Sequence, residues 1–473
     1  MFSIARMRLD GRRFSMTAKA DGIIAAATAA GRGGIGVVRV SGSRELVLGL
    51  IRSMTRVVEP RPRHAHYTDF WDPAGKVIDR GVAIWYRAPH SYTGEDVLEF
   101  QSHGNPVILN WLIKSALEAG KTRGLRLAEP GEFTRRAFMN GRIDLAQAES
   151  VMDIVNANSE SAVRAAQRSL SGEFSTSCKD LEEALIALRT QVEAILDFPE
   201  EEIDFMQESR IREQTDEIAE RLGRIIASAS QGKLLREGAV VALAGKPNVG
   251  KSSLLNRLSE REVAIVTDIP GTTRDVIENT VLFDGVQIRL VDTAGLRKTD
   301  DVVESAGIGR ALKLIGEADL VLHIVSCEDG KGDDSALLEI KGQIPDGVPV
   351  ITVFNKADLL STGSHELKKD KTIFVSAKTG EGLDALKRAV LECVGYNGSV
   401  QSVYLARSRH LESLKDAAGH IDLAKQILNS SNMQLDIVAE ELRMGARALG
   451  EIVGEFSSDD LLGRIFSSFC IGK

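Results

Sequence analysis

A glycine-rich segment that ends in lysine and serine has the composition of a phosphate-binding loop. The apolar run Ala239–Ala244 predicts a strand, and the segment Gly245–Ser253 (GKPNVGKSS) leads from it into a helical pattern. In this GxxxxGK[ST] spacing, backbone N–H groups can converge on a phosphate at a helix N-terminus. Lys251 would bring positive charge to the β- and γ-phosphates, and Ser252 would supply a hydroxyl to Mg²⁺. A plain glycine turn before a helix is the alternative, which the spacing disfavours.

Three later motifs follow apolar segments in the order typical of a nucleotide-binding parallel sheet. The segment Asp292–Gly295 (DTAG) follows VQIRLV, so the aspartate would act on Mg²⁺ through water and the glycine N–H would meet the γ-phosphate. The segment Asn355–Asp358 (NKAD) follows VITVF, and its final carboxylate can accept both N–H donors on the guanine edge, which adenine lacks. The segment Ser376–Lys378 (SAK) follows TIFV and completes the base pocket. The motifs together predict GTP rather than ATP as the nucleotide.

The residues predicted to bind GTP come from these four motifs and from the loop 267–275. They are Gly245, Asn248, Val249, Gly250, Lys251, Ser252, Ser253, Thr267, Thr272, Thr273, Asp292, Thr293, Ala294, Gly295, Asn355, Lys356, Asp358, Ser376, Ala377 and Lys378.

The residues that would position the attacking water are less ordinary. Small GTPases of the Ras type keep a glutamine directly after DxxG, whereas Leu296 stands there in this chain. Arg274 and Arg297 are interpreted as surface or structural residues rather than as arginine fingers. Hydroxyls and carbonyls of the loop 267–275 lie in sequence where a monovalent cation site would fit beside Asn248, and Thr273 is the natural second hydroxyl ligand of Mg²⁺.

Patterns along the chain predict several domains. Segments Gly36–Ser41, Gly81–Tyr86 and Asp96–Gln101 read as strands, and Pro106–Ala119 reads as a helix. Apolar residues at spacings of four and three then predict helices between about 140 and 236 and again after about 400. One predicted helix has its apolar face at Leu181, Leu185, Leu188, Val192 and Ile195, and Phe198-Pro199 would end it. The later helices have theirs at Leu411, Leu414, Ile421, Ile427, Val438, Leu442 and Leu449. Strands and helices alternate between about 237 and 396, which predicts a doubly wound α/β domain inserted into one discontinuous helical domain.

Composition narrows the function class. The 473 residues are 43% hydrophobic and 27% charged, as in ordinary globular domains, and no apolar run approaches the roughly 20 residues of a membrane span. The net charge of -8 argues against a broad electrostatic grip on nucleic acid, so any RNA contact must be local or shared with a partner. The four cysteines lie far apart, which favours reduced thiols and a cytoplasmic protein. A short mitochondrial presequence within the basic first 16 residues is the alternative to an extension.

Segments flanking the nucleotide motifs carry a family resemblance. They are Arg32–Gly42 (RGGIGVVRVSG), Ser91–Gly104 (SYTGEDVLEFQSHG), Glu129–Ala148 (EPGEFTRRAFMNGRIDLAQA) and Leu461–Lys473 (LLGRIFSSFCIGK). The chain closely resembles the tRNA uridine-5-carboxymethylaminomethyl modification GTPases, the MnmE (TrmE) family, from about residue 20 to its end. The resemblance implies an N-terminal α+β domain that binds tetrahydrofolate, a discontinuous helical domain and an inserted Ras-like P-loop G domain. The expected segments are 1–20 (extension), 21–138 (folate binding and dimerisation), 139–236 (helical, first part), 237–396 (G domain) and 397–473 (helical, second part, with the CIGK tail).

The resemblance also implies cofactors and partners. Such proteins form homodimers, act with the FAD-containing protein MnmG, and modify carbon 5 of the wobble uridine of certain tRNAs with a one-carbon unit of 5-formyl- or methylene-tetrahydrofolate. GTP hydrolysis would depend on Mg²⁺ and on K⁺, which would take the part of an arginine finger between paired G domains. A ribosome-assembly or signalling GTPase is one alternative. A folate enzyme that the G domain only regulates is another.

Site residues follow from the same resemblance. The K⁺ ligands would be the side chains of Asn248 and Thr272 and main-chain oxygens of Thr267 and Ile269; the Mg²⁺ ligands would be Ser252 and Thr273. Glu304 would orient the attacking water in place of the glutamine that is missing at Leu296. Lys251 would act at the phosphates. Folate would contact Arg39, Glu99, Arg142 and Lys473, although the family often has lysine at the place of Arg142. Cys470 matches a cysteine implicated in modification rather than hydrolysis.

Overall fold

The computed structural model describes residues 21–197, 205–261, 279–292, 316–329, 344–345, 347–360, 372–398, 403–430, 434–455, 459–470 and 472. The chain divides into two compact units, one of Met1–Asp144 with Ser457–Lys473 and the other of Leu145–Phe456. The C-terminal tail thus belongs to the same unit as the N-terminal sheet. The finer five-segment division stays a prediction. Of the helices that the structure describes, none is both long and apolar enough to cross a membrane.

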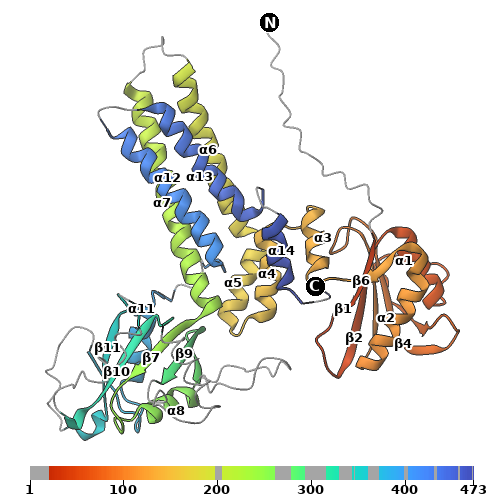
Figure 1. Cartoon of the computed structure of the whole chain (residues 1–473), viewed down its shortest axis with the longest axis horizontal. Coiled ribbons are helices and arrows are strands. Elements are labelled where there is room, and N and C mark those ends of the chain that lie inside the picture. The colour runs from red at the N-terminus through yellow and green to blue at the C-terminus, as the bar shows by residue number, and fades with distance from the viewer. Residues whose placement is uncertain are drawn as a thin grey trace. The chain divides into compact units, whose positions relative to one another are not determined.

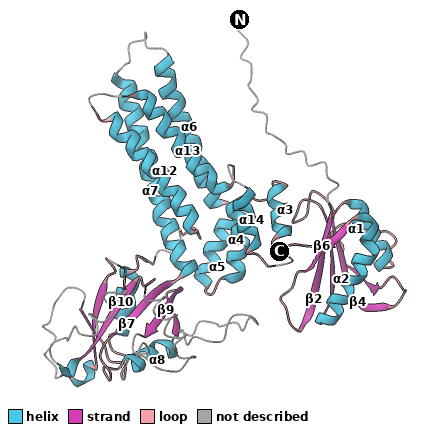
Figure 2. Ribbon diagram, in the orientation of Figure 1, coloured by secondary structure: helices cyan, strands magenta, loops and turns pink. Residues whose placement is uncertain are grey.

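The first unit is a six-stranded sheet covered by two helices. Strand order is β3-β4-β5-β2-β1-β6, antiparallel except for the β1–β6 pair (Figure 2). Helices α1 and α2 pack on the sheet over a core that includes Phe70 and Phe100, whose rings meet edge to face at 5.3 Å. The elements are β1 (Gly22–Ala26), β2 (Gly33–Gly42), α1 (Arg44–Met54), β3 (His66–Trp71), β4 (Val77–Tyr86), β5 (Asp96–Gly104), α2 (Pro106–Gly120), η1 (Lys121–Arg123), β6 (Leu125–Leu127), α3 (Glu132–Met139) and α14 (Asp459–Ser467).

Local sequence signals account for the elements of this unit. The three predicted strands are confirmed as parts of β2, β4 and β5, and the predicted helix is α2. That helix begins where expected because Asn105 caps it, its side chain accepting the Val107 N–H, and because proline occupies the first turn. Capping and burial of one apolar face fix its bounds.

Helices on both sides of the inserted domain share one core in the second unit. The predicted inward positions Leu181, Leu185 and Leu188 of α6 are buried together with Leu414 of α12 and Leu442 of α13, which confirms the discontinuous helical domain (Figure 1). Helix α6 ends at Asp197, directly before Phe198-Pro199, as predicted. The helices are α4 (Leu145–Asn156), α5 (Glu160–Ser171), α6 (Glu173–Asp197), α7 (Phe205–Glu237), α12 (Ser408–Leu428) and α13 (Leu435–Val453).

The inserted α/β part carries a second six-stranded sheet, ordered β12-β11-β10-β7-β9-β8. All neighbouring pairs are parallel except β8 with β9, so the carboxyl ends of five strands share one edge, where such folds bind ligands. The elements are β7 (Ala239–Ala244), α8 (Lys251–Arg261), β8 (Asn279–Phe283), β9 (Val286–Asp292), β10 (Leu320–Ser326), η3 (Cys327–Asp329), β11 (Val350–Asn355), η4 (Ala357–Leu359), β12 (Thr372–Phe374) and α11 (Leu383–Cys393).

Candidate functional site

The loop between β7 and α8 has the backbone of a phosphate cradle. Asn248 and Gly250 both have positive φ, 65° and 91°. Close approach by neighbouring elements explains two glycines: a Cβ on Gly245 would lie 2.4 Å from the carbonyl oxygen of Ile324, and one on Gly250 would lie 2.3 Å from Nδ2 of Asn355. Both positions therefore require glycine, and the turn leads directly into α8.

The positively charged ammonium group of Lys251 lies within this loop. The side chain is buried, and Nζ donates to the carbonyl oxygens of Gly245 at 2.6 Å and of Lys246 at 2.8 Å. Ser252 and Ser253 are exposed in the first turn of α8, where free N–H groups and the helix dipole favour an anion. The arrangement offers a cation and helix N–H groups to one phosphate chain.

Asn355 ties two of the motif loops together rather than standing free for the base. Its side chain is buried; Nδ2 donates to the carbonyl oxygen of Val249 at 3.0 Å, and Oδ1 accepts the N–H of Ala377 at 3.1 Å. The asparagine thus sets the phosphate loop at a fixed distance from the SAK segment. The sequence motif predicted a nucleotide residue here, but this bridging contact depends on tertiary pairing.

Asp358 is the exposed carboxylate of the segment that is predicted to read the base. The hydroxyl of Ser376 donates to its Oδ1 at 2.6 Å and holds the pKa of Asp358 below its usual value. Ser376 is itself buried, and its hydroxyl also accepts the Thr379 N–H at 3.1 Å. An ionised, oriented acceptor therefore faces solvent at the carboxyl edge of the sheet. The SAK segment holds it there.

Lys356 has a partner that sequence reasoning missed. The residue has φ 67°, and its Nζ donates to Oε2 of Glu328 at 2.6 Å, a contact that lowers the pKa of Glu328. Burial, followed by the charge of Asp358, raises the pKa of the Cys327 thiol. The only sequence signal for the contact between Lys356 and Glu328 was the position of Glu328 after the neighbouring strand β10. That position does not predict which residue Glu328 contacts.

The residues that could hold Mg²⁺ are partly described. Asp292 ends β9 and pairs in register with Leu243 of β7, the strand that leads into the phosphate loop. Ser252 is the second residue of α8, the helix after that loop. A hydroxyl oxygen from this helix and a carboxylate oxygen from the strand beside β7, both of which Mg²⁺ prefers, are therefore available at one edge of the sheet. The predicted site residues that lie outside the described residues are Thr267, Ile269, Thr272, Thr273, Thr293, Ala294, Gly295, Glu304 and Lys473.

In the first unit, two of the residues predicted to bind folate meet as an ion pair. Arg39 on β2 and Glu99 on β5 are partners in register, and the Arg39 Nε donates to Glu99 Oε1 at 2.8 Å. The guanidinium lies 5.9 Å from the ring centres of both Tyr92 and Phe133. Tyr86 donates to Glu99 at 3.5 Å, and burial followed by the Glu99 charge raises the Tyr86 pKa. Charge and aromatic faces thus share one place on the sheet.

The C-terminal tail reaches the same place. A further Arg39 nitrogen donates to the carbonyl oxygen of Gly472 at 3.4 Å. Gly472 has φ 98°, and a Cβ there would lie 2.1 Å from the carbonyl oxygen of Ala26 on β1. Cys470 is exposed, and its carbonyl oxygen accepts the Gly131 N–H at 3.4 Å. The tail segment therefore packs on the sheet beside Arg39.

Arg142 lies near this group without an ion pair to Glu99 in the part of the chain that the structure describes. Its side chain passes Gly94, whose hypothetical Cβ would lie 3.2 Å from the Arg142 Cγ. Gly94 is two residues after Tyr92, whose ring lies beneath Arg39. The exposed Arg142 therefore lies against the turn that carries that ring.

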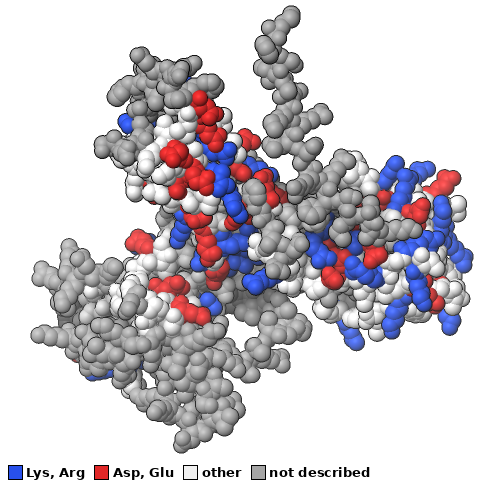
Figure 3. Space-filling model, turned by 45° about the horizontal axis from the view of Figure 1, so that its top comes forward, with Lys and Arg blue, Asp and Glu red and all other residues white. Residues whose placement is uncertain are grey.

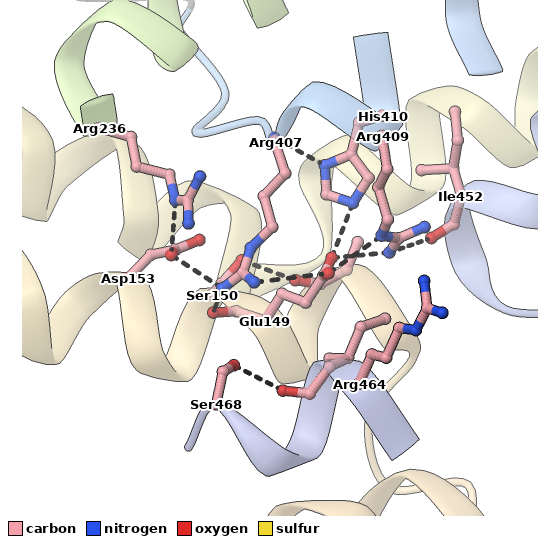
Figure 4. Close-up of polar contacts among 12 residues, drawn as sticks. Glu149, Ser150, Asp153, Arg236, Arg407, Arg409, His410, Ile452, Arg464 and Ser468 are labelled. Carbon is pink, nitrogen blue, oxygen red and sulfur yellow. Dashed lines mark hydrogen bonds and ion pairs between the residues drawn. The ribbon is translucent and has the colours of Figure 1, made fainter. Parts of the chain in front are cut away.

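A buried charged cluster was not predicted from the sequence. Glu149 of α4 accepts two hydrogen bonds from Arg409, at 2.6 and 3.0 Å, and one from Nε2 of His410 at 2.8 Å (Figure 4). Asp153, one turn later, accepts from Arg236 and Arg407, each at 3.0 Å. Its members are separated by up to 261 residues, so local pattern could not pair them.

Comparisons with known proteins cover nearly the whole chain. Residues 22–142 match the family described as "GTP-binding protein TrmE N-terminus", and residues 145–470 match the "MnmE helical domain". The chain is 52% identical over 457 residues to a tRNA modification GTPase MnmE of Bordetella avium, covering 95% of this chain and 99% of the relative. A protein of the same description from Burkholderia mallei is 49% identical over 463 residues, covering 96% and 99%.

Solved structures resemble parts of the chain. Era of Aquifex aeolicus, bound to GDP and aluminium fluoride, is 26% identical with a TM-score of 0.25, covering 39% of this chain and 67% of that one. The FeoB G-domain of Methanococcus jannaschii is 25% identical with a TM-score of 0.24, covering 33% and 97%.

Proposed function

The chain belongs to the MnmE family of tRNA modification GTPases, and we propose that, with an FAD-containing MnmG partner, it installs the carboxymethylaminomethyl group at carbon 5 of the wobble uridine of certain tRNAs. Sequence identity of about one half to the MnmE relatives, over at least 95% of the chain, is the observation that supports this proposal. The protein is a GTP hydrolase. The proposed setting is a cytoplasmic homodimer, with a mitochondrial location as the alternative.

The described geometry supports the nucleotide part of the proposal. The loop after β7 offers Lys251 and the N-terminus of α8 to the phosphates, and Asp358 offers an ionised acceptor to guanine. Mg²⁺ held by Ser252 and Thr273, with Asp292 acting through water, would neutralise charge that develops on the phosphates. Glu304 is proposed to orient the attacking water.

Potassium is proposed as the second cation, with Asn248, Thr272, Thr267 and Ile269 as its ligands. Asn248 is exposed in the phosphate loop with φ 65°, so its side chain is not committed to the core. We expect GTP hydrolysis in KCl to exceed that in NaCl at equal ionic strength by about 100-fold, as for one electrostatic group at a transition state. Initial rates of phosphate release measure the preference.

Two variants make the potassium test specific. Asn248→Ala should lose most of the preference for K⁺, whereas Asn256→Ala, an exposed asparagine on α8, should keep it. Equal rates in both salts would remove the potassium site and move weight to a signalling GTPase, whose product is a conformational state.

Folate binding is proposed at the Arg39–Glu99 pair, with Arg142 and Lys473 as further contacts. Arg39→Met should weaken binding of 5-formyl-tetrahydrofolate about tenfold or more, because a charge-assisted hydrogen bond contributes about 1.5–3 kcal/mol. Isothermal titration calorimetry measures the affinity. Arg80→Met is the control, because Arg80 pairs with Asp69 elsewhere on the same sheet. Equal affinity in both variants would move the folate site away from Arg39.

The tRNA contact is proposed to be local, because the chain is acidic overall. Figure 3 shows many Lys and Arg side chains on the visible face of the N-terminal unit. Exposed basic residues include Arg44 and Arg52 on α1. Arg123 is also exposed, and its guanidinium lies beside Gly49 of α1.

Cys470 is proposed to act in modification. If the G domain only regulates a folate enzyme, Lys251→Ala would leave modification partly intact.

A further inference from the structure

The hairpin β8–β9 joins the two segments that are proposed to sense the phosphates. The segment 262–278, with Thr272 and Thr273, precedes β8, and Asp292 ends β9. Gly285, in the turn Asp284-Gly285 between the strands, therefore lies seven residues before Asp292, about 23 Å away along an extended strand. If the two paired strands move as a rigid ribbon, a movement at their phosphate end also displaces this turn.

The turn contacts the first turn of helix α5. The hydroxyl of Ser159 donates to the carbonyl oxygen of Gly285 at 2.7 Å and accepts the Ala162 N–H at 3.2 Å, so one side chain both caps α5 and holds the hairpin. Asn158 donates to the Gln287 side chain at 3.1 Å. Helix α5 lies next to this end of the sheet in Figure 1.

Gly285 fits this contact closely. It has φ 87°, and a Cβ there would lie 2.7 Å from Oγ of Ser161. On its other side, the Tyr396 hydroxyl donates to the carbonyl oxygen of Asp284 at 3.4 Å. The tip of the hairpin is thus enclosed by α5 and by the end of the α/β part.

The preceding helix α4 holds both chain connections to the α/β part. Arg236 stands just before β7, and Arg407 stands just before α12, where the chain returns to the helices; both donate to Oδ1 of Asp153. Between these pairs and the hairpin lies a cavity of about 160 Å³, lined by Asp153, Asn158, Ser159, Arg236, Gly285 and Gln287. Both connections are held by one carboxylate, whereas the hairpin contact borders this cavity.

We propose that Ser159 and Gly285 are positioning residues through which the nucleotide site and the helical domain bias each other. The β8–β9 hairpin acts as a lever whose tip engages the α5 cap to different degrees with GDP and with GTP, while Asp153 keeps the two chain connections in place. This inference rests on the proposed nucleotide cycle. It does not depend on tRNA, folate or K⁺.

Linkage provides a test that a merely structural contact would not pass. A contact of equal strength in both nucleotide states cannot change the ratio of the two nucleotide affinities, whereas a state-dependent one must. The full-length protein is titrated in NaCl with fluorescent GDP and with fluorescent guanosine 5′-(β,γ-imido)triphosphate, and the ratio of the dissociation constants is compared between variants.

The informative variant is Ser159→Asp. Aspartate still caps α5 but cannot donate to the Gly285 carbonyl, so the affinity ratio should shift about fivefold, the value of one net hydrogen bond. Ser159→Thr keeps the hydroxyl and should leave the ratio unchanged. Gly285→Ala should shift it too, whereas Gly347→Ala, with a similar φ of 85° and nothing within 4 Å, should not.

An unchanged ratio in both Ser159→Asp and Gly285→Ala would overturn the proposal. Hydrogen exchange of the wild-type protein tests it without any variant: amides at the start of α5 should exchange at different rates with GDP and with the GTP analogue. Equal exchange in the two states would also overturn it. Loss of K⁺ stimulation or of tRNA modification would instead count against the proposed function, because neither enters these measurements.

Discussion

Replacing Asp358 with asparagine is expected to lower GTP affinity by about 10²- to 10⁴-fold and to create affinity for xanthosine triphosphate. The ionised carboxylate can accept two N–H groups of guanine, each hydrogen bond contributing about 1.5–3 kcal/mol. An asparagine amide offers one acceptor and one donor, and the donor would face the guanine amino group. Xanthine carries a carbonyl in place of that amino group, so its edge matches asparagine. Displacement of a fluorescent guanine nucleotide by GTP and by xanthosine triphosphate measures both affinities.

The control for this exchange is Asp384→Asn, an exposed carboxylate on α11 outside the base pocket. It should keep the preference for GTP. If Asp358→Asn also kept that preference, Asp358 would not be the residue that reads guanine. The hydroxyl of Ser376 would then orient a carboxylate with another role.

The place of the nucleotide motifs on the sheet was predictable because the signal for it is local. The segments 245–253, 355–358 and 376–378 each lie at or just after the end of a strand, and parallel strands bring their carboxyl ends to one edge. Spacing therefore predicted that these segments meet at one edge of the sheet. It could not give the bridge from Asn355 to Val249 and Ala377, or the Glu328 partner of Lys356, because those contacts depend on strand order and on the exact turn geometry.

Other parts were predictable only as elements. Periodicity located the helices and their buried faces, since an apolar stripe records which side meets the core. The resemblance named Arg39 and Glu99 as folate contacts, but it did not predict their ion pair, because 60 residues separate them and the register of β2 with β5 is set by the whole sheet. The place of the tail beside β1 likewise has no local signal. Tertiary packing alone determines it.

The charged cluster on α4 shows the same limit and sets the second large effect. Glu149 is buried, and burial opposes its ionisation, but hydrogen bonds from His410 and Arg409, together with the charge of Arg409, outweigh this and hold the pKa of Glu149 well below its usual range. His410 accepts the Arg407 N–H at Nδ1, so the proton on Nε2 is the one donated to Glu149. A neutral imidazole satisfies both contacts, in agreement with its pKa, which burial lowers.

Glu149→Ala is expected to destabilise the helical domain by about 3–5 kcal/mol, because removing one partner leaves the Arg409 guanidinium without its carboxylate in a buried site. Urea unfolding followed by far-ultraviolet circular dichroism at pH 7.5 measures the loss. Glu193→Ala on α6 is the matched control; its ion pair with Arg189 is partly exposed and should contribute 1 kcal/mol or less. Equal losses in the two variants would show that the cluster contributes no more than a surface pair.

The same cluster predicts the direction of the pH dependence. Glu149 and His410 both have pKa values lowered on folding, so the unfolded chain takes up their protons first as pH falls. Their contribution is complete above the ordinary histidine value of 6.5 and declines below it, first through His410 and then, below 4.5, through Glu149. Glu149→Ala removes the carboxylate part, so the stability lost by this substitution should shrink as pH falls below 4.5. A loss that stayed constant down to pH 3 would mean that Glu149 is not held ionised by its partners. Packing alone would then explain the cost of replacing it.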